Sequence, residues 1–257
     1  MPCCSTWGID NTMKSSLLLF LDFDGVICDS IDECFLSSWI AFYRYYLGQE
    51  PPAVSLQLHR QFGQLRPYIR DGQDYLLIHQ ILKQGGWVRN QAEFDLLIEQ
   101  AGKEQMAAFK QLFYRGRNFL LDEDFTYWYR LNHLYSHITP HITREADNEN
   151  LFILSTKKPE YIAAIFGFNG IVFNEDRILY PGTRSKSSVI KEILADRPGC
   201  TALFVDDQID HLTKEQHSTI QPYLASWGYI KPEWLNGPVP VLYPAGTGDL
   251  FRQILKN

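Results

Sequence analysis

The sequence predicts an α/β protein with a Rossmann-like parallel sheet and an inserted, all-helical segment. The first observation is a set of three short apolar runs, each next to a segment of helical periodicity, which is typical of βα units. These runs are apolar without alternation, as expected of parallel strands buried on both faces. The last observation is a stretch of about 110 residues after the first unit; this stretch has helical patterns and no convincing strand.

The first βα unit begins with the run Leu17–Leu21, followed by a loop and a helix from Ile31. Ser30 and Glu33 have the spacing of a capping box, in which the two side chains bond reciprocally to backbone N–H groups at a helix start. The pattern therefore predicts a capped helix that begins just after Ser30.

The other two units lie in the second half of the chain. Leu151–Leu154 precedes a helix that opens at Pro159, a residue favoured in a first helical turn, and ends near Gly167. The third run, Ala202–Val205, follows a helix from about Ser185 to Ala195. We expect these runs to pair in parallel with the first one.

The long helical stretch interrupts the α/β part after its first strand. Its clearest helical patterns cover Asp74–Leu82 and Glu93–Leu112. We therefore expect a helical cap at residues 30–141 and an α/β domain made of residues 1–29 and 142–257.

Composition excludes several classes of protein. Of the 257 residues, 24 are Lys or Arg and 30 are Asp or Glu, giving a net charge of −6. An acidic surface repels phosphate backbones, so we expect no nucleic-acid partner. The longest apolar run, Leu17–Leu21, is far shorter than the about 20 residues of a membrane span, so we expect no membrane association. We predict a cytoplasmic protein, as a monomer or homodimer.

The cysteines give no sign of a disulfide framework. There are five, an odd number without metal-binding spacing, which favours reduced thiols. The adjacent pair Cys3 and Cys4 fits a disordered terminus better than a redox site. Met13 is an alternative to Met1 as the start of the chain.

Acidic residues follow two of the apolar runs. Asp22 and Asp24 come directly after the first, and Asp206 and Asp207 directly after the third. Because the carboxyl ends of parallel strands line one crevice, we expect these side chains to meet there. Carboxylates gathered at one place repel each other unless a proton or cation neutralises them. Since oxygen ligands of this kind suit Mg²⁺, we predict that these four residues hold that ion.

A hydroxyl and a lysine are expected at the same crevice. Ser155 and Thr156 follow the second run, and Lys186 lies in the first turn of a helix, where the helix dipole disfavours a cation. A bound anion would explain that lysine. A hard cation, a hydroxyl and a lysine together form a cradle for a transferring phosphoryl group.

These residues carry a resemblance to a known family. In order and spacing they resemble the four motifs of the haloacid dehalogenase superfamily: Leu19-Phe20-Leu21-Asp22-Phe23-Asp24-Gly25-Val26, Ser155, Lys186 and Asp206-Asp207. A helical insert directly after the first motif is similar to the superfamily's C1 cap. Two further segments resemble phosphoglycolate-phosphatase-like members: Arg66-Pro67 with Gly72 and Tyr75, and Ser226-Trp227-Gly228-Tyr229.

The resemblance implies a Mg²⁺-dependent phosphatase of small phosphorylated metabolites. In it, Asp22 is the nucleophile that forms an aspartyl-phosphate, and Asp24 is the general acid and base. Ser155 binds the transferred phosphoryl oxygens, and Lys186 neutralises their charge. The resemblance further implies that Asp207 binds Mg²⁺ with help from Asp206, an oxygen of Asp22 and the backbone carbonyl of Asp24.

Two details of the motifs depart from the usual pattern or require a choice. Many relatives have an aspartate four residues after the last motif, whereas here Asp210 lies three residues and His211 four residues beyond Asp207. The role of Asp210 is open. We favour Ser155 over Thr156 as the motif hydroxyl because Ser155 ends the apolar run; Thr156 and Arg66 are expected at the substrate.

Other activities compete with the phosphatase prediction. A dehalogenase needs no second aspartate, because a leaving halide takes no proton, so Asp24 favours phosphoryl chemistry. A phosphonatase would use a cap lysine, and Lys83, Lys103 and Lys110 stand in no telling context. A phosphomutase, another phosphotransferase and a catalytically silent phospho-ligand-binding protein remain alternatives.

Two weaker patterns concern basic side chains. Guanidinium groups match carboxylates and phosphates, so the arginines of the insert are candidates for a second acidic group of the substrate. They are Arg66, Arg70, Arg115 and Arg117. His133, His137 and His141 recur every four residues, but Pro140 interrupts a helix there, so we expect packed or solvated histidines rather than a metal site.

Overall fold

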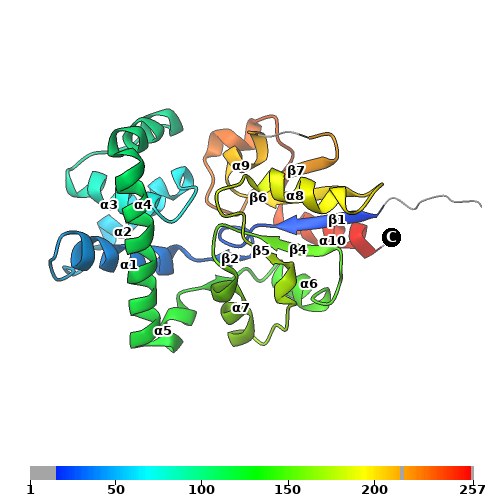
Figure 1. The fold of residues 1–257 in the computed structure, drawn as a ribbon, viewed down its shortest axis with the longest axis horizontal. Coiled ribbons are helices and arrows are strands. Elements are labelled where there is room, and N and C mark those ends of the chain that lie inside the picture. Colours follow the sequence, from blue (N-terminus) through cyan, green and yellow to red (C-terminus); the bar gives the residue numbers. More distant parts are fainter. Residues whose placement is uncertain (1–15, 215–216, 256–257) are drawn as a thin grey trace, which may run out of the picture.

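A computed structural model describes residues 16–214 and 217–255 of the chain. Its two parts lie side by side, a group of helices and a sheet flanked by helices (Figure 1). Cys3, Cys4, Met1 and Met13 lie outside the described residues, so the predictions about them stay untested.

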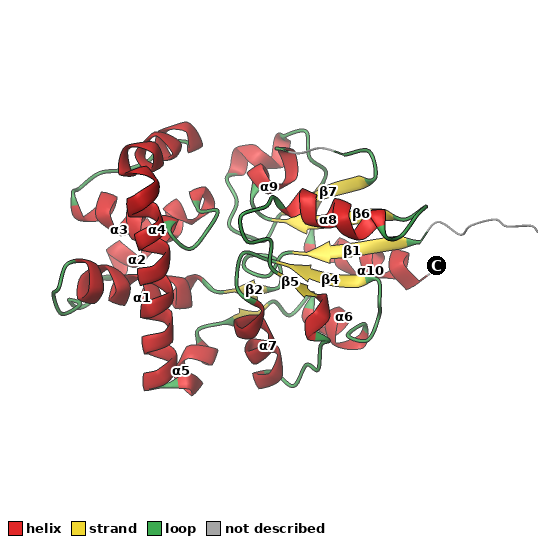
Figure 2. Ribbon diagram, viewed as in Figure 1, coloured by secondary structure: helices red, strands yellow, loops and turns green. Residues whose placement is uncertain are grey.

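A parallel sheet of six strands forms the α/β part, in the order β5-β4-β1-β6-β7-β8. Figure 2 shows this sheet with helices around it. The strands are β1 (Leu17–Leu21), β4 (Leu151–Leu154), β5 (Ile178–Leu179), β6 (Thr201–Asp206), β7 (Ile220–Ala225) and β8 (Val241–Leu242). Every pairing is parallel, and β1 lies between β4 and β6, with Leu21 opposite both Ile153 and Val205. The predicted strands and the parallel sheet are therefore confirmed.

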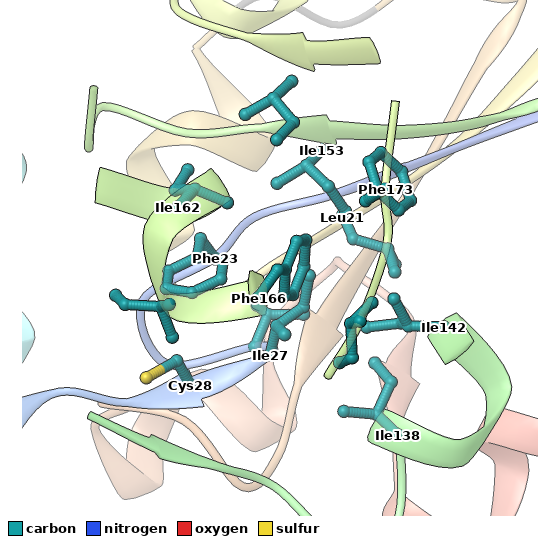
Figure 3. Close-up of a cluster of buried hydrophobic side chains, with 14 of the residues drawn as sticks. Leu21, Phe23, Ile27, Cys28, Ile138, Ile142, Ile153, Ile162, Phe166 and Phe173 are labelled. Atoms are coloured by element: carbon teal, nitrogen blue, oxygen red, sulfur yellow. The ribbon is translucent and has the colours of Figure 1, made fainter. Parts of the chain in front are cut away.

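Helices cover both faces of this sheet. They are α6 (Thr139–Arg144), α7 (Pro159–Phe168), α8 (Lys186–Ala195), α9 (Ile209–Thr213) and α10 (Thr247–Leu255). On one face, Leu21 and Ile153 of the strands pack with Ile162 and Phe166 of α7 (Figure 3). On the other face, Phe20 and Phe204 pack with Ile190 of α8. Burial on both faces explains why these strands are apolar at every position.

The helical part has its own apolar core. It comprises α1 (Ile31–Ile40) continued by a π-helical segment (Ala41–Tyr46), then α2 (Leu56–Leu65), α3 (Asp74–Lys83), α4 (Gln91–Glu123) and α5 (Phe125–Arg130). Many of the aromatic side chains lie in this core, among them Phe35, Phe62 and Phe109. Helix α4 crosses α1 so closely that a Cβ on Gly116 would lie 2.3 Å from the backbone oxygen of Ser37. Glycine therefore permits the contact between the two helices.

A small antiparallel pairing joins the two segments that connect the parts. Strand β2 (Cys28–Asp29) precedes α1, and β3 (His133–Leu134) follows α5. The chain enters and leaves the helical part through these two short strands. Their few residues give no periodic signal, so the sequence predicts neither strand. Four 3-10 turns complete the described elements: Arg66–Tyr68, Glu175–Arg177, Pro232–Asn236 and Pro244–Gly246.

The capping box predicted at α1 is wrong, although the helix does begin at Ile31. Ser30 makes no side-chain capping bond. The carboxylate of Glu33 instead accepts two hydrogen bonds from Arg117, at 2.8 Å each. Charge-assisted bonds to a guanidinium are stronger than a bond to a backbone N–H, which explains the difference. The helix predicted at Glu93–Leu112 is longer than expected and is kinked at Gly102, where φ is 76°.

No helix among the described residues has the length and apolarity needed to cross a membrane.

Candidate active site

The turn after β1 directs two carboxylates into one cavity. Phe23 is fully buried and packs against Phe166 of α7. Because side chains of an extended chain alternate, Asp22 and Asp24 lie on the opposite side, where both line the cavity. Gly25 then turns the chain with a φ of 85°, which residues with a side chain rarely adopt.

Lys186 at the start of α8 lies between two carboxylates. Its Nζ is 2.9 Å from Oδ1 of Asp22 and 2.7 Å from Oδ2 of Asp206. Asp206 also accepts from the backbone N–H of Gln208 and contacts Nδ1 of His211, at 2.8 and 3.0 Å. Burial lowers the pKa of Lys186, but these two carboxylates outweigh it and raise that pKa. Carboxylates thus explain why a cation occupies this helix start.

Asp207 occupies space that two glycines leave open. A Cβ on Gly25 would lie 2.0 Å from its Oδ2, and a Cβ on Gly228 would lie 2.4 Å from its Cβ. Oδ2 accepts a hydrogen bond of 2.7 Å from the backbone N–H of Tyr229. The turn after β1 and the loop after β7 therefore close around this one carboxylate.

Asp22, Asp206 and Asp207 form the carboxylate cluster of this site. One oxygen of each lies within 4.8 Å of the others, and all three residues are buried. Burial and the neighbouring carboxylates raise the pKa of Asp207 well above its usual range, and burial likewise raises that of Asp22. Such a cluster fits a hard divalent cation, which removes the repulsion that these pKa values reflect.

Asp24 places its carboxylate elsewhere in the cavity. Its Oδ1 accepts a hydrogen bond of 2.9 Å from Nζ of Lys157, and the carboxylate also bonds to the side chain of Ser30. Although burial opposes it, Lys157 lowers the pKa of Asp24. The prediction of four converging carboxylates therefore holds for three of them, since the carboxylate of Asp24 is paired with a lysine.

The two candidate hydroxyls after β4 point in different directions. Ser155 is 1% exposed, and its side chain hydrogen-bonds to Asp22. Thr156 instead donates from Oγ1 to the backbone oxygen of Arg70 in the helical part, at 3.5 Å. Ser155 is thus the hydroxyl beside Asp22.

Arg66 presents an unusual buried cation to the same cavity. It is 7% exposed, and its guanidinium lies 4.2 Å from the ring centroid of Tyr229 and 5.5 Å from that of Tyr75. Its Nε makes no hydrogen bond with any residue that the structure describes. Asp207 is near enough to raise its pKa, but no carboxylate of the described residues forms a salt bridge with it, so this buried guanidinium is a suitable group for binding an anion.

The loop after β6 holds the helical part against the α/β part. Gln208 donates from Nε2 to the backbone oxygens of Pro67 and Ile69, at 2.9 and 3.1 Å. Asp210, whose role was open, lies 2.8 Å from Nε of Arg70. The segment that follows Asp206 and Asp207 therefore also fixes the segment that contains Arg66.

The remaining sequence candidates lie outside the carboxylate cluster. Arg115 stacks on Tyr45 at 3.9 Å. His133 lies in β3, whereas His141 lies in α6 and stacks on Phe251. His137 packs against Trp227. The three histidines are packed or exposed, as expected.

Comparison of the sequence alone gives no relatives: no protein-family model matches the chain, and no curated protein does. Comparison of the structure, in contrast, finds solved structures with a similar fold. A haloacid dehalogenase-like hydrolase from Streptococcus pneumoniae superposes with a TM-score of 0.58 at 14% identity, over 92% of this chain and 98% of that one. The chain has the haloacid dehalogenase fold.

Two phosphoglycolate phosphatases assigned by prediction have the same fold. That of Lactobacillus delbrueckii subsp. bulgaricus has a TM-score of 0.58 at 11% identity and covers 92% of this chain and 97% of its own. That of Haemophilus somnus has a TM-score of 0.55 at 14% identity and covers 91% and 96%. The high coverage shows that the helical insert belongs to this haloacid dehalogenase fold along with the sheet.

Sequence reasoning missed that a second group of charges lies beside the cavity, and it assigned one member, Arg117, to the substrate, whereas Arg117 is paired with Glu33. Lys157, Glu33 and Arg117 are each at most 2% exposed and are joined by ion pairs. Lys157 directly follows Ser155 and Thr156, so its place after a strand was a usable signal. Glu33 gave a misleading one, because its spacing from Ser30 matches a capping box.

Proposed function

We propose that the protein is a Mg²⁺-dependent phosphatase of the haloacid dehalogenase superfamily that hydrolyses a small phosphorylated metabolite. The observation that carries this proposal is the position of Asp22. It is a buried carboxylate beside one lysine, one serine hydroxyl and two further carboxylates, at the end of a central strand. A nucleophile, a cation and a phosphoryl-binding hydroxyl therefore stand together.

The first half of the reaction is attack of a carboxylate oxygen of Asp22 on phosphorus. A P–O bond to Asp22 forms and the P–O bond to the alcohol breaks, giving an aspartyl-phosphate. Asp24 gives a proton to the departing alcohol oxygen. Its low pKa is compatible with this role, because a bound phosphate dianion nearby raises the pKa of a carboxyl group.

The second half returns the enzyme to its starting state. Asp24, now ionised, takes a proton from a water molecule, whose oxygen attacks phosphorus. The bond to Asp22 breaks and inorganic phosphate leaves. Lys186 and Ser155 remain beside Asp22 throughout and offset the charge on the phosphoryl oxygens.

The residues present fit a magnesium ion. Asp22 and Asp207 would hold it, together with the backbone carbonyl of Asp24, whereas Asp206 already bonds to Lys186, His211 and Gln208. A bound Mg²⁺ would lower the repulsion between an anionic nucleophile and an anionic substrate.

The cap region would select the substrate. The cavity has a volume of about 30 Å³, room for about two water molecules. Arg66, Tyr75 and Phe113 of the helical part line it beside the carboxylates. We infer that a small ester binds when the helical part moves, and that Arg66 meets an acidic group of that ester.

A screen of phosphorylated metabolites with and without Mg²⁺ tests the proposal. Asp22→Asn should lower phosphate release by about 10⁴-fold or more, because it removes the nucleophile and keeps the shape of the side chain. Circular dichroism should show an unchanged fold. Undiminished phosphate release by this variant would rule out the aspartyl-phosphate route.

A further inference from the structure

Lys157 connects the general acid and base to the helical part. It follows β4, it belongs to the α/β part, and its side chain is 0% exposed. An ammonium group has three protons to donate, and the structure gives Lys157 three acceptors. Its position is therefore fully determined by the residues around it.

The three acceptors come from three different segments. Oδ1 of Asp24, in the turn after β1, is 2.9 Å from Nζ. Oε2 of Glu33, on α1, and Oδ1 of Asn132, just before β3, are both 3.4 Å away. Glu33 follows β2 closely and Asn132 precedes β3, so these two acceptors flank the connection between the parts.

Glu33 is itself held by the helical part. Its carboxylate is buried and accepts from Arg117 on α4, from Nε1 of Trp128 at 3.1 Å, and from Oγ of Ser37 at 2.7 Å. Buried ionic groups with this many bonds have little freedom to move separately. A shift of the helical part about β2 and β3 thus moves Glu33 and Asn132 relative to Lys157.

We propose that Lys157 and Glu33 are positioning residues that hold the carboxylate of Asp24 in its working orientation only while the helical part is in the place seen here. This inference rests on the proposed phosphatase function. Lys157 makes the one ion pair of Asp24 among the described residues. Loss of Lys157 therefore leaves that carboxylate with its bond to Ser30, and withdrawal of Glu33 removes one of the three acceptors that hold Lys157 beside it. Proton transfer then fails, while the groups beside Asp22 stay in place.

The test uses the dependence of turnover on the leaving group. Expulsion of p-nitrophenolate needs little help from an acid, whereas expulsion of an alkyl alcohol needs a proton. In the full-length chain with Mg²⁺, Lys157→Met should lower the initial release of alcohol from glycerol phosphate by about 10²-fold. Release of p-nitrophenol from the second ester, p-nitrophenyl phosphate, should change far less in the first turnover.

Further variants separate positioning from packing. Lys157→Arg, which keeps the charge, should restore part of the loss with glycerol phosphate. Glu33→Gln should show the same leaving-group dependence as Lys157→Met, in a milder form. Glu93→Gln, a glutamate of α4 that pairs with Arg89, is the matched control and should behave like wild type. Equal losses with both esters in Lys157→Met would overturn the inference.

A crystal structure of Lys157→Met provides a readout that needs no activity. We expect the Asp24 carboxylate to turn away while Asp22, Ser155 and Lys186 stay in place. An Asp24 side chain in the same orientation would contradict the inference even if the wild-type chain hydrolysed no ester. Absence of turnover in the wild type would instead count against the proposed function.

Discussion

Two groups of buried charges lie beside one cavity, and they differ in how they are balanced. The first contains Asp22, Asp206 and Asp207, with Lys186 paired to the first two and Arg66 beside the third. The second contains Asp24 and Glu33 with two full cations, Lys157 and Arg117. In the first, the pKa values of Asp22 and Asp207 stay raised in spite of these cations, whereas in the second the pKa values of both carboxylates are lowered. The direction of the pKa shifts, rather than the number of charges, thus distinguishes the two groups.

Breaking the balance of the second group should have the largest effect on stability. Arg117→Met leaves the buried carboxylate of Glu33 without its bidentate partner, which we expect to lower the free energy of unfolding by about 3–5 kcal/mol. Urea unfolding measures this loss. Arg115→Met, on the same helix, removes a cation that stacks on Tyr45 and should cost about 1 kcal/mol or less. Equal losses would show that the buried pair contributes no more than a surface contact.

Acid should affect Glu33 of the second group and Asp22 and Asp207 of the first in opposite directions, whereas Asp206, whose pKa is lowered in spite of burial by Lys186 and His211, should behave like Glu33. The pKa of Glu33 is lowered from 4.5 to about 2, because Arg117 and Lys157 outweigh burial. Its stabilising contribution is therefore present above pH 4.5 and is lost as the pH falls towards 2, about 3 kcal/mol in all. The raised pKa values of Asp22 and Asp207 act oppositely, since their protonation stabilises the fold as the pH falls from neutral.

The metal-free chain should consequently be most stable in mild acid. Unfolding experiments in urea between pH 7 and pH 2 should show stability rising first and then falling. Asp207→Asn should remove most of the rise and keep the fall. A steady decline from pH 7 in the wild type would contradict the raised pKa values of Asp22 and Asp207.

Added Mg²⁺ should stabilise the first group at neutral pH. At about 100 times its dissociation constant, an ion that binds only the folded chain adds about 2.7 kcal/mol, which raises the melting temperature by several degrees. Asp207→Asn should lose this shift, whereas Asp95→Asn, which removes a carboxylate of α4 outside the cluster, should retain it. A shift that persists in Asp207→Asn would mean that the ion binds elsewhere.

The smallest effect is expected at the surface contact between the two parts. Asp210 pairs with Arg70 and Lys214, and its side chain is 18% exposed. Asp210→Asn should therefore lower the free energy of unfolding by about 1 kcal/mol or less. The change in the Michaelis constant, expressed as a free energy, should exceed the change in the free energy of unfolding, because Arg70 belongs to the segment that carries Arg66. An unchanged Michaelis constant would show that the pair does not fix that segment.

The sequence predicts the sheet better than it predicts the charged network. Leu17–Leu21 and Leu151–Leu154 are bounded as expected, because burial on both faces makes a strand recognisable from local composition. Asp22 and Asp207 could be brought together by topology alone, since both follow neighbouring strands. The partners of Glu33 could not be predicted in this way, because Arg117 is 84 residues away and no local sequence pattern links helices that cross.

The two glycines around Asp207 give a practical rule for recognising this arrangement in other chains. A Cβ at either Gly25 or Gly228 would collide with the Asp207 side chain. A related sequence that has the paired aspartates of the first turn but a larger residue at either glycine position would have to seat its last-motif carboxylate differently. Searches for enzymes of this type can therefore use the glycines as a filter, even where overall identity is too low to align the chains.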